Sequence, residues 1–283
     1  PEVTGMSAKK EGFFKSEFFH NFVRSPGAMA GLLIVTFFVV LVTAGPLFTP
    51  QNPYDIGSLD LMDAFKPPVW MEGGDPAFVL GTDDQGRDLL SAMVYGSRIS
   101  LFIGLSVVVL SCVLGTFLGL TAGYFGGRLD SLLMRIVDIQ LSFPAMLVAL
   151  FIMAAFGRGL GKLVTALTIV GWVLYARTVR GSVLVEKKKE YVDAARLIGL
   201  SPFPIILRHV LPNILSVLIV QATIQFAIAI LAEAALSYLG LGTQPPQPSW
   251  GRMLSEAQTL MFQAPLLAVW PGVAIALAVL GLN

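Results

Sequence analysis

The sequence is short of charged residues, cysteine and histidine. Charged residues make up 13% of its 283 positions and the mean hydropathy is +0.76, whereas soluble domains carry about 25% charged residues. A single cysteine, Cys112, excludes an internal disulfide. The net charge of +1 argues against a nucleic-acid-binding surface. The composition therefore predicts a membrane protein with several spans rather than a soluble domain.

Catalytic and metal-binding patterns are also missing from the sequence. His20 and His209 are far apart and have no metal-ligand spacing around them. The run 157–162 superficially resembles a phosphate-binding loop, but it lacks the first glycine at the required spacing. Leu163 also stands where that motif has Ser or Thr. We therefore expect no catalytic residue, metal ion or cofactor in this chain by itself.

Six apolar runs are long enough to cross a bilayer, whose ~30 Å hydrocarbon core needs about 20 helical residues. The second run carries Gly115, Gly119 and Gly123 at four-residue spacing, a smooth stripe where another helix backbone can approach closely. The sequence thus predicts an all-α membrane protein with six transmembrane helices. The six runs cover residues 28–48, 99–122, 136–156, 163–180, 214–232 and 264–282.

The distribution of Lys and Arg predicts which side of the membrane each polar segment occupies. These residues are dense in residues 1–27 and 186–213, whereas residues 49–97 are mostly acidic. The positive-inside rule therefore predicts cytoplasmic termini, an extracytoplasmic 49–97 segment and a core of spans over 98–283. Residues 1–27 fit either an amphipathic helix on the membrane surface or a flexible tail. Because the sequence begins with Pro and ends in an apolar run, we expect a longer natural chain.

The segment from Glu186 to Asn213 is the one long charged run, and it lies between two apolar runs. Apolar residues at helical spacing predict a short helix that ends at Gly199, a natural C-terminal stop. A second short helical segment begins after Ser201, and Pro212 precedes the next span. A basic loop that only fixes topology would explain Lys187–Lys189, but not the Ala-Ala pair, the glycine and the Leu-Pro pair at their spacings.

Those spacings carry a resemblance to a known family. Asp193-Ala194-Ala195, Gly199 and Leu211-Pro212 resemble the "EAA" loop of ABC importer permeases, with Asp193 where the pattern usually has Glu and His209 where it has Ile. Two further stretches, 81–101 and 233–251, are similar to segments of the same family. The sequence most resembles the C-type permease of dipeptide and oligopeptide importers, a type I ABC importer permease.

The resemblance implies a function and a set of partners. The loop would be the coupling helix that docks the cytoplasmic ATPase subunits, with Ala195 on the docking face. The other partners would be a second homologous permease, an extracytoplasmic solute-binding protein and the lipid of a bacterial inner membrane. ATP and magnesium would bind the ATPases, and the cargo would be a short peptide or a related solute. The implied contact residues are Glu190, Tyr191, Asp193, Ala194, Ala195, Gly199, Leu211 and Pro212.

Three residues in the apolar runs are candidates for the transport path or a gate. Asp138 lies near the cytoplasmic edge, where pairing with Arg135 or a neighbouring loop is favoured, and Pro144 should kink its helix. Glu233 should lie near the outer rim of its helix, within reach of water or a partner. An ion-coupled secondary transporter with Asp138 or Glu233 as its proton site is the alternative. A non-transporting scaffold has no positive feature in its favour.

Overall fold

The computed structural model describes residues 17–282 except residues 56 and 58, and within them it is helical with no strand. The expectation for residues 1–27 therefore falls partly outside the described residues. Within that segment, Glu17–Arg24 form a helix. The α-helices are α1 (Glu17–Arg24), α2 (Pro26–Ala44), α3 (Leu89–Phe125), α4 (Gly127–Leu141), α5 (Ala145–Phe156), α6 (Leu160–Glu186), α7 (Glu190–Leu197), α8 (Pro202–Pro204), α9 (Leu211–Tyr238), α10 (Trp250–Gln258) and α11 (Leu266–Leu282), with 3-10 turns at Gly45–Leu47 and Leu61–Asp63 and a π-helix, η5, at Ile205–Val210.

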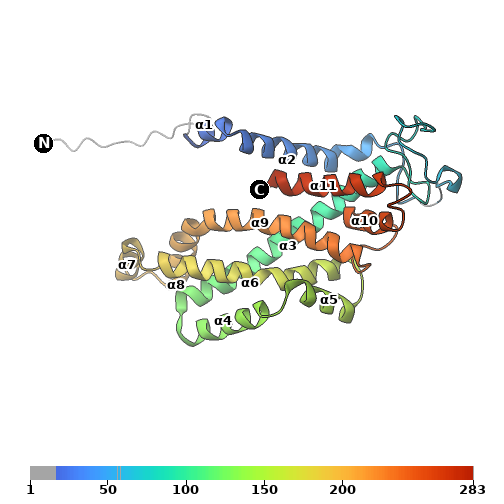
Figure 1. Cartoon of the computed structure of the whole chain (residues 1–283). Coiled ribbons are helices and arrows are strands. Elements are labelled where there is room, and N and C mark those ends of the chain that lie inside the picture. The colour runs from blue at the N-terminus through green and yellow to red at the C-terminus, as the bar shows by residue number, and fades with distance from the viewer. Residues whose placement is uncertain (1–16, 56, 58, 283) are drawn as a thin grey trace.

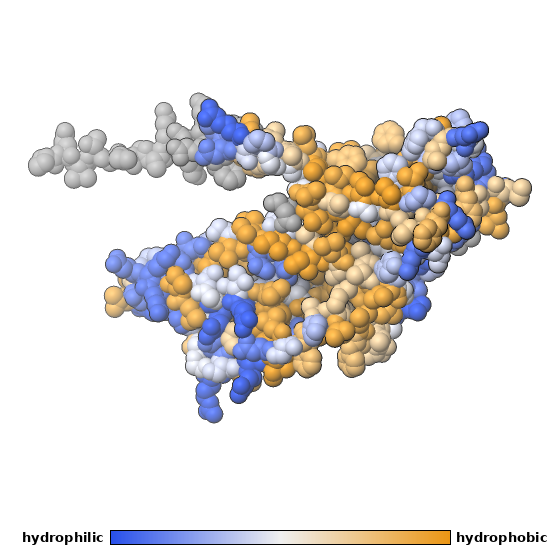
Figure 2. All heavy atoms as spheres, in the orientation of Figure 1, coloured by the Kyte–Doolittle hydropathy of each residue, from blue (hydrophilic) through white to orange (hydrophobic). Residues whose placement is uncertain are grey.

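The long helices form a layered bundle that α3 crosses from one end to the other (Figure 1). Helices α2 and α11 lie side by side, α9 lies beneath them, and α6 with α4 and α5 forms the far side. Helix α1 and the small helix α7 lie toward one end of the bundle, and the 49–88 segment and α10 lie at the other. An apolar band separates the two polar ends (Figure 2), as expected for a protein that spans a bilayer.

The packing of α3 on α6 is the most extensive helix contact of the fold. A Cβ added at Gly115 would lie 2.4 Å from the Cβ of Tyr175, and one added at Gly119 would lie 2.7 Å from a backbone oxygen of α6. At Gly123 the distance to the Cβ of Val183 would be 2.8 Å. All three distances are shorter than the van der Waals contact between two carbon atoms, or between a carbon and an oxygen atom. The predicted close approach along this stripe is confirmed, because only glycine fits at these positions.

The third apolar run is not one helix with a kink. Helices α4 and α5 are separated by a break at residues 142–144 and are bent by 88° relative to each other. Pro144 stands at the N-cap of α5, where its missing N–H would have no helical partner in any case. The expectation of a kink at Pro144 is therefore corrected to a full break.

Four or five helical segments of the described residues could span a bilayer, by their length and composition. Four helices within the described residues are long and apolar enough to cross a bilayer, and the broken α4–α5 pair would make a fifth. Helix α11 is apolar but has only 17 residues, at the lower limit of the ~17–25 residues that a span needs. The all-α membrane fold is confirmed, and the count of six spans stays a prediction.

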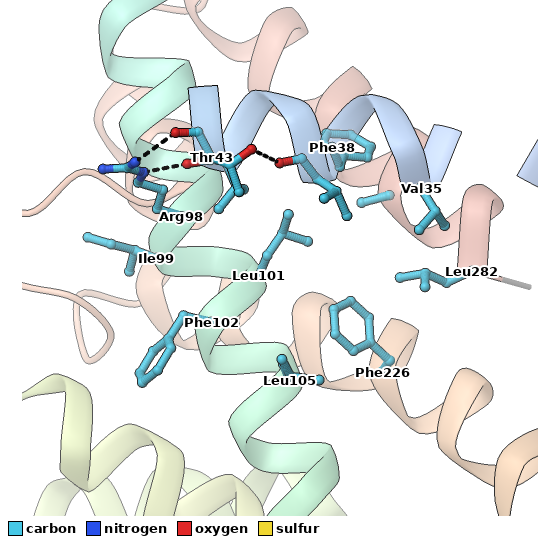
Figure 3. A pocket seen from close by; sticks show the side chains of 13 residues that line it. Val35, Phe38, Thr43, Arg98, Ile99, Leu101, Phe102, Leu105, Phe226 and Leu282 are labelled. Atoms are coloured by element: carbon cyan, nitrogen blue, oxygen red, sulfur yellow. Dashed lines mark hydrogen bonds between the residues drawn. The ribbon is translucent and has the colours of Figure 1, made fainter. Parts of the chain in front are cut away.

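An apolar cavity of about 850 Å³ lies between α2, α3, α9 and α11 (Figure 3). Its charged residue is Arg98 on α3, whose Nε donates to the carbonyl oxygen of Val42 at 2.6 Å and whose Nη2 lies 3.4 Å from that of Thr43. These carbonyls belong to the last turn of α2, where backbone acceptors lack helical partners. Arg98 therefore fastens the end of α2 to the bundle.

The glycine stripe generates the first prediction. Gly119→Ala should lower the free energy of unfolding by about 1–3 kcal/mol, because the added Cβ overpacks the α3–α6 contact. Gly181→Ala on α6 is the matched control, since a Cβ there meets nothing within 4 Å. The thermal unfolding midpoint of each purified variant in detergent is the measurement. Equal midpoints for the two variants would contradict the close packing.

Candidate functional site

Helix α7 ends at a glycine in a left-handed conformation, as the sequence predicts. Gly199 has φ +82°, and its N–H bonds to the carbonyl of Arg196 at 3.0 Å. The N–H of Leu200 bonds back to the carbonyl of Ala195 at 3.1 Å. These two bonds make a Schellman motif, which occupies the last carbonyls of the helix. The direction of the chain after α7 is thereby fixed.

One face of α7 packs on the protein's own core. Val192 and Ala195 are buried at 0% and 4% exposure in a cluster with side chains of α3, α6, η5 and α9. The expectation that Ala195 lies on the docking face is therefore wrong, and its neighbour Ala194 is the exposed member of the pair. The spacing of the Ala-Ala pair predicts a helix but does not determine its rotation about its axis.

Polar contacts tie α7 to the ends of three long helices. The hydroxyl of Tyr191 donates to the carboxylate of Glu186 at the end of α6, and it accepts from Nδ2 of Asn213 on α9 at 3.2 Å. The guanidinium of Arg196 lies over the ring of Tyr124 on α3, 5.6 Å from its centroid. Burial, reinforced by the bond to Glu186, raises the pKa of Tyr191 to about 12. Its hydroxyl therefore stays protonated at neutral pH.

The opposite face of α7 and the turn after it are apolar and exposed. Leu197, Ile198 and Phe203 are 88%, 76% and 71% exposed, and Glu190 and Asp193 lie exposed on the same helix. Helix α7 lies at one end of the bundle (Figure 1), and Figure 2 shows that this end is largely hydrophilic. Large apolar side chains gathered on a surface that faces water mark an interaction site. We call Leu197, Ile198 and Phe203 the apolar tip.

The segment after the apolar tip runs directly into the next long helix. Residues 202–238 are continuously helical, so Leu211 and Pro212 lie in the first turn of α9 and not in a loop before it. The π-helix η5 precedes them, and there the N–H of Leu211 bonds to the carbonyl of Ile206. The α7–α8 turn is therefore joined to α9 by continuous helix.

The path candidates lie in different parts of the fold. Asp138, in the last turn of α4, pairs with Arg177 of α6 at 2.6 Å, and both side chains are more than half exposed. Asp138 is thus paired, but its partner is Arg177 on helix α6 and not Arg135 or a loop, the partners that the sequence favoured. Pro144 stands at the break between α4 and α5. The structure does not bring either residue together with Glu233.

Glu233 lies near the end of α9 and has hydrogen-bond partners, as expected, but it is fully buried and out of reach of water. Its carboxylate accepts hydrogen bonds from Ser237 at 2.7 Å, from Ser249 at 2.9 Å and from Ser100 of α3 at 3.3 Å. Ser100 Oγ also accepts the backbone N–H of Trp250, in the first turn of α10. Helix α10 folds back over the end of α9 and covers the carboxylate. Glu233 therefore ties α3, α9 and α10 together.

The described residues contain no group of three His, Cys, Asp or Glu side chains that could hold a metal ion.

Comparisons with known proteins agree with this geometry. Residues 115–283 match the family described as "Binding-protein-dependent transport system inner membrane component", and residues 14–68 match the "N-terminal TM domain of oligopeptide transport permease C". The chain belongs to the family of binding-protein-dependent transport permeases.

Relatives of this permease are named as peptide transport permeases. The di/tripeptide transport system permease protein DppC of Pseudomonas aeruginosa is 44% identical over 94% of this chain and 87% of its own length. The dipeptide permease DppC of Escherichia coli (strain K12) is 45% identical over 94% of this chain and 88% of its own length. The ion-coupled alternative receives no support from these relatives.

A solved structure shares the fold of the permease. A chain from an inward-facing form of the MetNI methionine ABC transporter aligns with a TM-score of 0.56 and 20% identity, over 66% of this chain and 89% of that chain. The permease is thus a multi-pass inner-membrane subunit of an ABC importer with a type I fold.

Sequence reasoning missed the ion pairs that hold the 49–88 segment on the permease core. Arg87 pairs with Asp83 at 2.6 Å and with Glu256 of α10 at 3.0 Å, and Arg252 pairs with Glu256 at 2.7 Å. Burial alone would lower the pKa of Arg87, but the two carboxylates outweigh it and the pKa is raised. Asp83 lies in a stretch that resembles the family, but Glu256 lies outside those stretches, and its separation of 169 residues from Arg87 gives no sign of the contact.

The two alanines of α7 give the second prediction. Ala195→Glu should reduce the amount of folded permease in the membrane, because it buries a carboxylate without a partner at a cost of several kcal/mol. Ala194→Glu, one residue away on the exposed side, should leave that amount close to wild type. Quantitative immunoblotting of membrane fractions and the unfolding midpoint of each purified variant test the pair. Equal accumulation of both variants would place Ala195 on the surface after all.

Proposed function

We propose that this permease carries short peptides inward and that cytoplasmic ATPase subunits drive it through the α7–α8 turn. The single observation that carries the proposal is the apolar tip: Leu197, Ile198 and Phe203 are exposed on α7 and the turn after it, and α7 is bonded to α3, α6 and α9. A subunit with exposed apolar side chains at a rigid, water-facing end needs a protein partner there.

The geometry supports a coupling role for this turn. Its movement is delivered to α9 through the continuous helix of residues 202–238, to α6 through Tyr191 and Glu186, and to α3 through Arg196 and Tyr124. An ATPase that closes on ATP would therefore move the turn and the three long helices as one body. Rigid-body motion between two packings is a common form of such switching.

The peptide cargo is supported by relatives named as dipeptide or di/tripeptide permeases, which are at least 39% identical over most of this chain. The remaining partners would be a second, homologous permease, two ATPases and an extracytoplasmic binding protein. ATP and Mg²⁺ would bind the ATPases. The N-terminus and α7 would face the cytoplasm and the 49–88 segment the other side. Helix α7 and that segment lie at opposite ends of the bundle, which fits this placement (Figure 1).

The apolar tip gives the third prediction. Leu197→Asp should weaken ATPase binding at least tenfold, because fully burying a leucine contributes ~1.5–3 kcal/mol and the aspartate adds a charge to the interface. The measurement is the amount of ATPase that co-purifies with the tagged permease over a series of salt washes. Phe262→Asp is the matched control, since Phe262 is also fully exposed but follows α10 at the other end of the bundle.

Uptake by the reconstituted complex tests the cargo and the energy source. Proteoliposomes that contain the two permeases, the ATPases and the binding protein should accumulate a labelled dipeptide only with ATP, and an uncoupler should have no effect. Wild-type ATPase retention by Leu197→Asp would exclude the apolar tip as the docking surface. Peptide uptake that needs no ATP and collapses with the proton gradient would overturn the importer function itself.

A further inference from the structure

The apolar cavity between α2, α3, α9 and α11, which we call the α2 cavity, is open at the surface of the bundle. Val39 on α2 and Phe102 and Leu105 on α3 line it, and each is 56% exposed. Apart from Arg98 and Thr43, all of its lining residues are apolar. Its volume of about 850 Å³ falls within the ~300–1,000 Å³ that small-molecule sites occupy. Since these helices belong to the apolar band, the cavity suits a hydrocarbon chain.

The charged end of the α2 cavity lies at the boundary of the apolar band. Arg98 directly precedes the apolar run 99–122. Its guanidinium carbon is 5.9 Å from the ring centroid of Tyr95, and that ring packs edge-on against Tyr54 at 5.4 Å. Tyrosine rings and the charged ends of arginines gather where the hydrocarbon core meets the lipid headgroups. This end of the cavity therefore lies at headgroup depth, on the side of the 49–88 segment.

From Arg98 the α2 cavity extends into the apolar band by less than the depth of one leaflet. Along α3 it reaches from residue 98 to residue 105, and along α2 from residue 42 back to residue 35. At ~1.5 Å per residue, both lengths are ~10 Å. Half of a ~30 Å hydrocarbon core is ~15 Å. A charge at headgroup depth and an apolar trough within one leaflet together match the shape of a phospholipid.

Arg98 carries a charge that no carboxylate in the described part of the chain neutralises. Its Nε and Nη2 atoms are bonded to backbone carbonyls of α2, and none of the ion pairs among the described residues includes it. Figure 3 shows its third nitrogen, Nη1, on the far side from those two bonds. Arg98 is half-buried, and Nη1 is accessible and unbonded within the same residues. Because charged groups at membrane depth nearly always have a partner, this nitrogen points to an anion from outside the chain.

We propose that the α2 cavity binds one anionic phospholipid of the membrane, with its phosphate on Arg98 and one acyl chain along α3 toward Leu105. The Nη1 atom donates to a phosphate oxygen, a charge-assisted contact for which arginine is well suited. The acyl chain covers the exposed sides of Val39 and Phe102. The lipid thus fills the space that separates α2 from α9, so that α2 is held along its length and not only by its bonds to Arg98.

The assembled complex with its ATPases and binding protein, reconstituted in bilayers, is the system for the test. The bilayers contain a small fraction of phosphatidylglycerol with a diazirine in one acyl chain, or of phosphatidylcholine with the same chain. After photolysis, mass spectrometry of peptides measures how much lipid is attached to the lining residues of α3. Val39→Trp fills part of the α2 cavity. Val40→Trp is the matched control, because Val40 is 55% exposed on the same helix but does not line the cavity.

The phosphatidylglycerol probe should label the α3 lining at least fivefold more than the phosphatidylcholine probe, the preference expected from one basic residue beside an anionic headgroup. Arg98→Gln should remove this preference. Val39→Trp should lower the labelling by phosphatidylglycerol at least fivefold, whereas Val40→Trp should leave it unchanged. The two tryptophan variants leave Arg98 and its bonds to α2 in place, so they test the site even if Arg98→Gln does not fold.

Either equal labelling by the two probes or no effect of Val39→Trp would overturn the proposal, because the lipid would then be the ordinary solvent of the bundle. The rival occupant of the α2 cavity is a helix of the second permease. Phe102→p-benzoylphenylalanine tests it in the same complex, since this photoreactive side chain stands in the cavity wall. We expect adducts with lipid. An adduct with the second permease would show that protein fills the cavity, and it would also overturn the lipid site.

Discussion

The close contact of α3 with α6 is the constraint on which the rest of the structure depends. Three glycines on α3 let the two backbones approach, and this contact sets where Tyr175 and the end of α6 lie. From that end Glu186 holds Tyr191, and Tyr191 with Arg196 holds α7 against α9 and α3. The orientation of the apolar tip is thus a consequence of packing deep in the bundle, because α7 itself has only two turns.

The other end of the bundle is held by a different kind of interaction. There the buried carboxylate of Glu233 accepts hydrogen bonds from hydroxyl groups on α3, on α9 and at the N-cap of α10. Arg87 pairs with a carboxylate of α10 and so holds the 49–88 segment to that helix. Helix α3 takes part at both ends. A force applied to α7 can therefore reach the far end through α3 and α9.

Much of this architecture could be predicted from the sequence, since it follows from local rules. Gly199 ends a helix because a left-handed residue is needed there, and the glycine stripe on α3 requires a close neighbour. Rotations and distant contacts could not be predicted. The face of α7 that carries Ala195 depends on packing against η5, and the burial of Glu233 depends on α10 folding back from 16 residues further along the chain. Pro144 marks a disturbance of its helix, but the 88° bend depends on the neighbouring helices.

The most direct test of the coupling account is a cross-link from the apolar tip. A benzophenone maleimide is attached to Ile198→Cys in a Cys112→Ser permease and is photolysed in the assembled complex. We expect the probe at Ile198→Cys to form an adduct with the ATPase subunit. The same probe at Phe262→Cys should form no adduct with that subunit. An ATPase adduct from position 262 and none from position 198 would contradict the account, because the nucleotide-driven partner would then sit at the other end of the bundle.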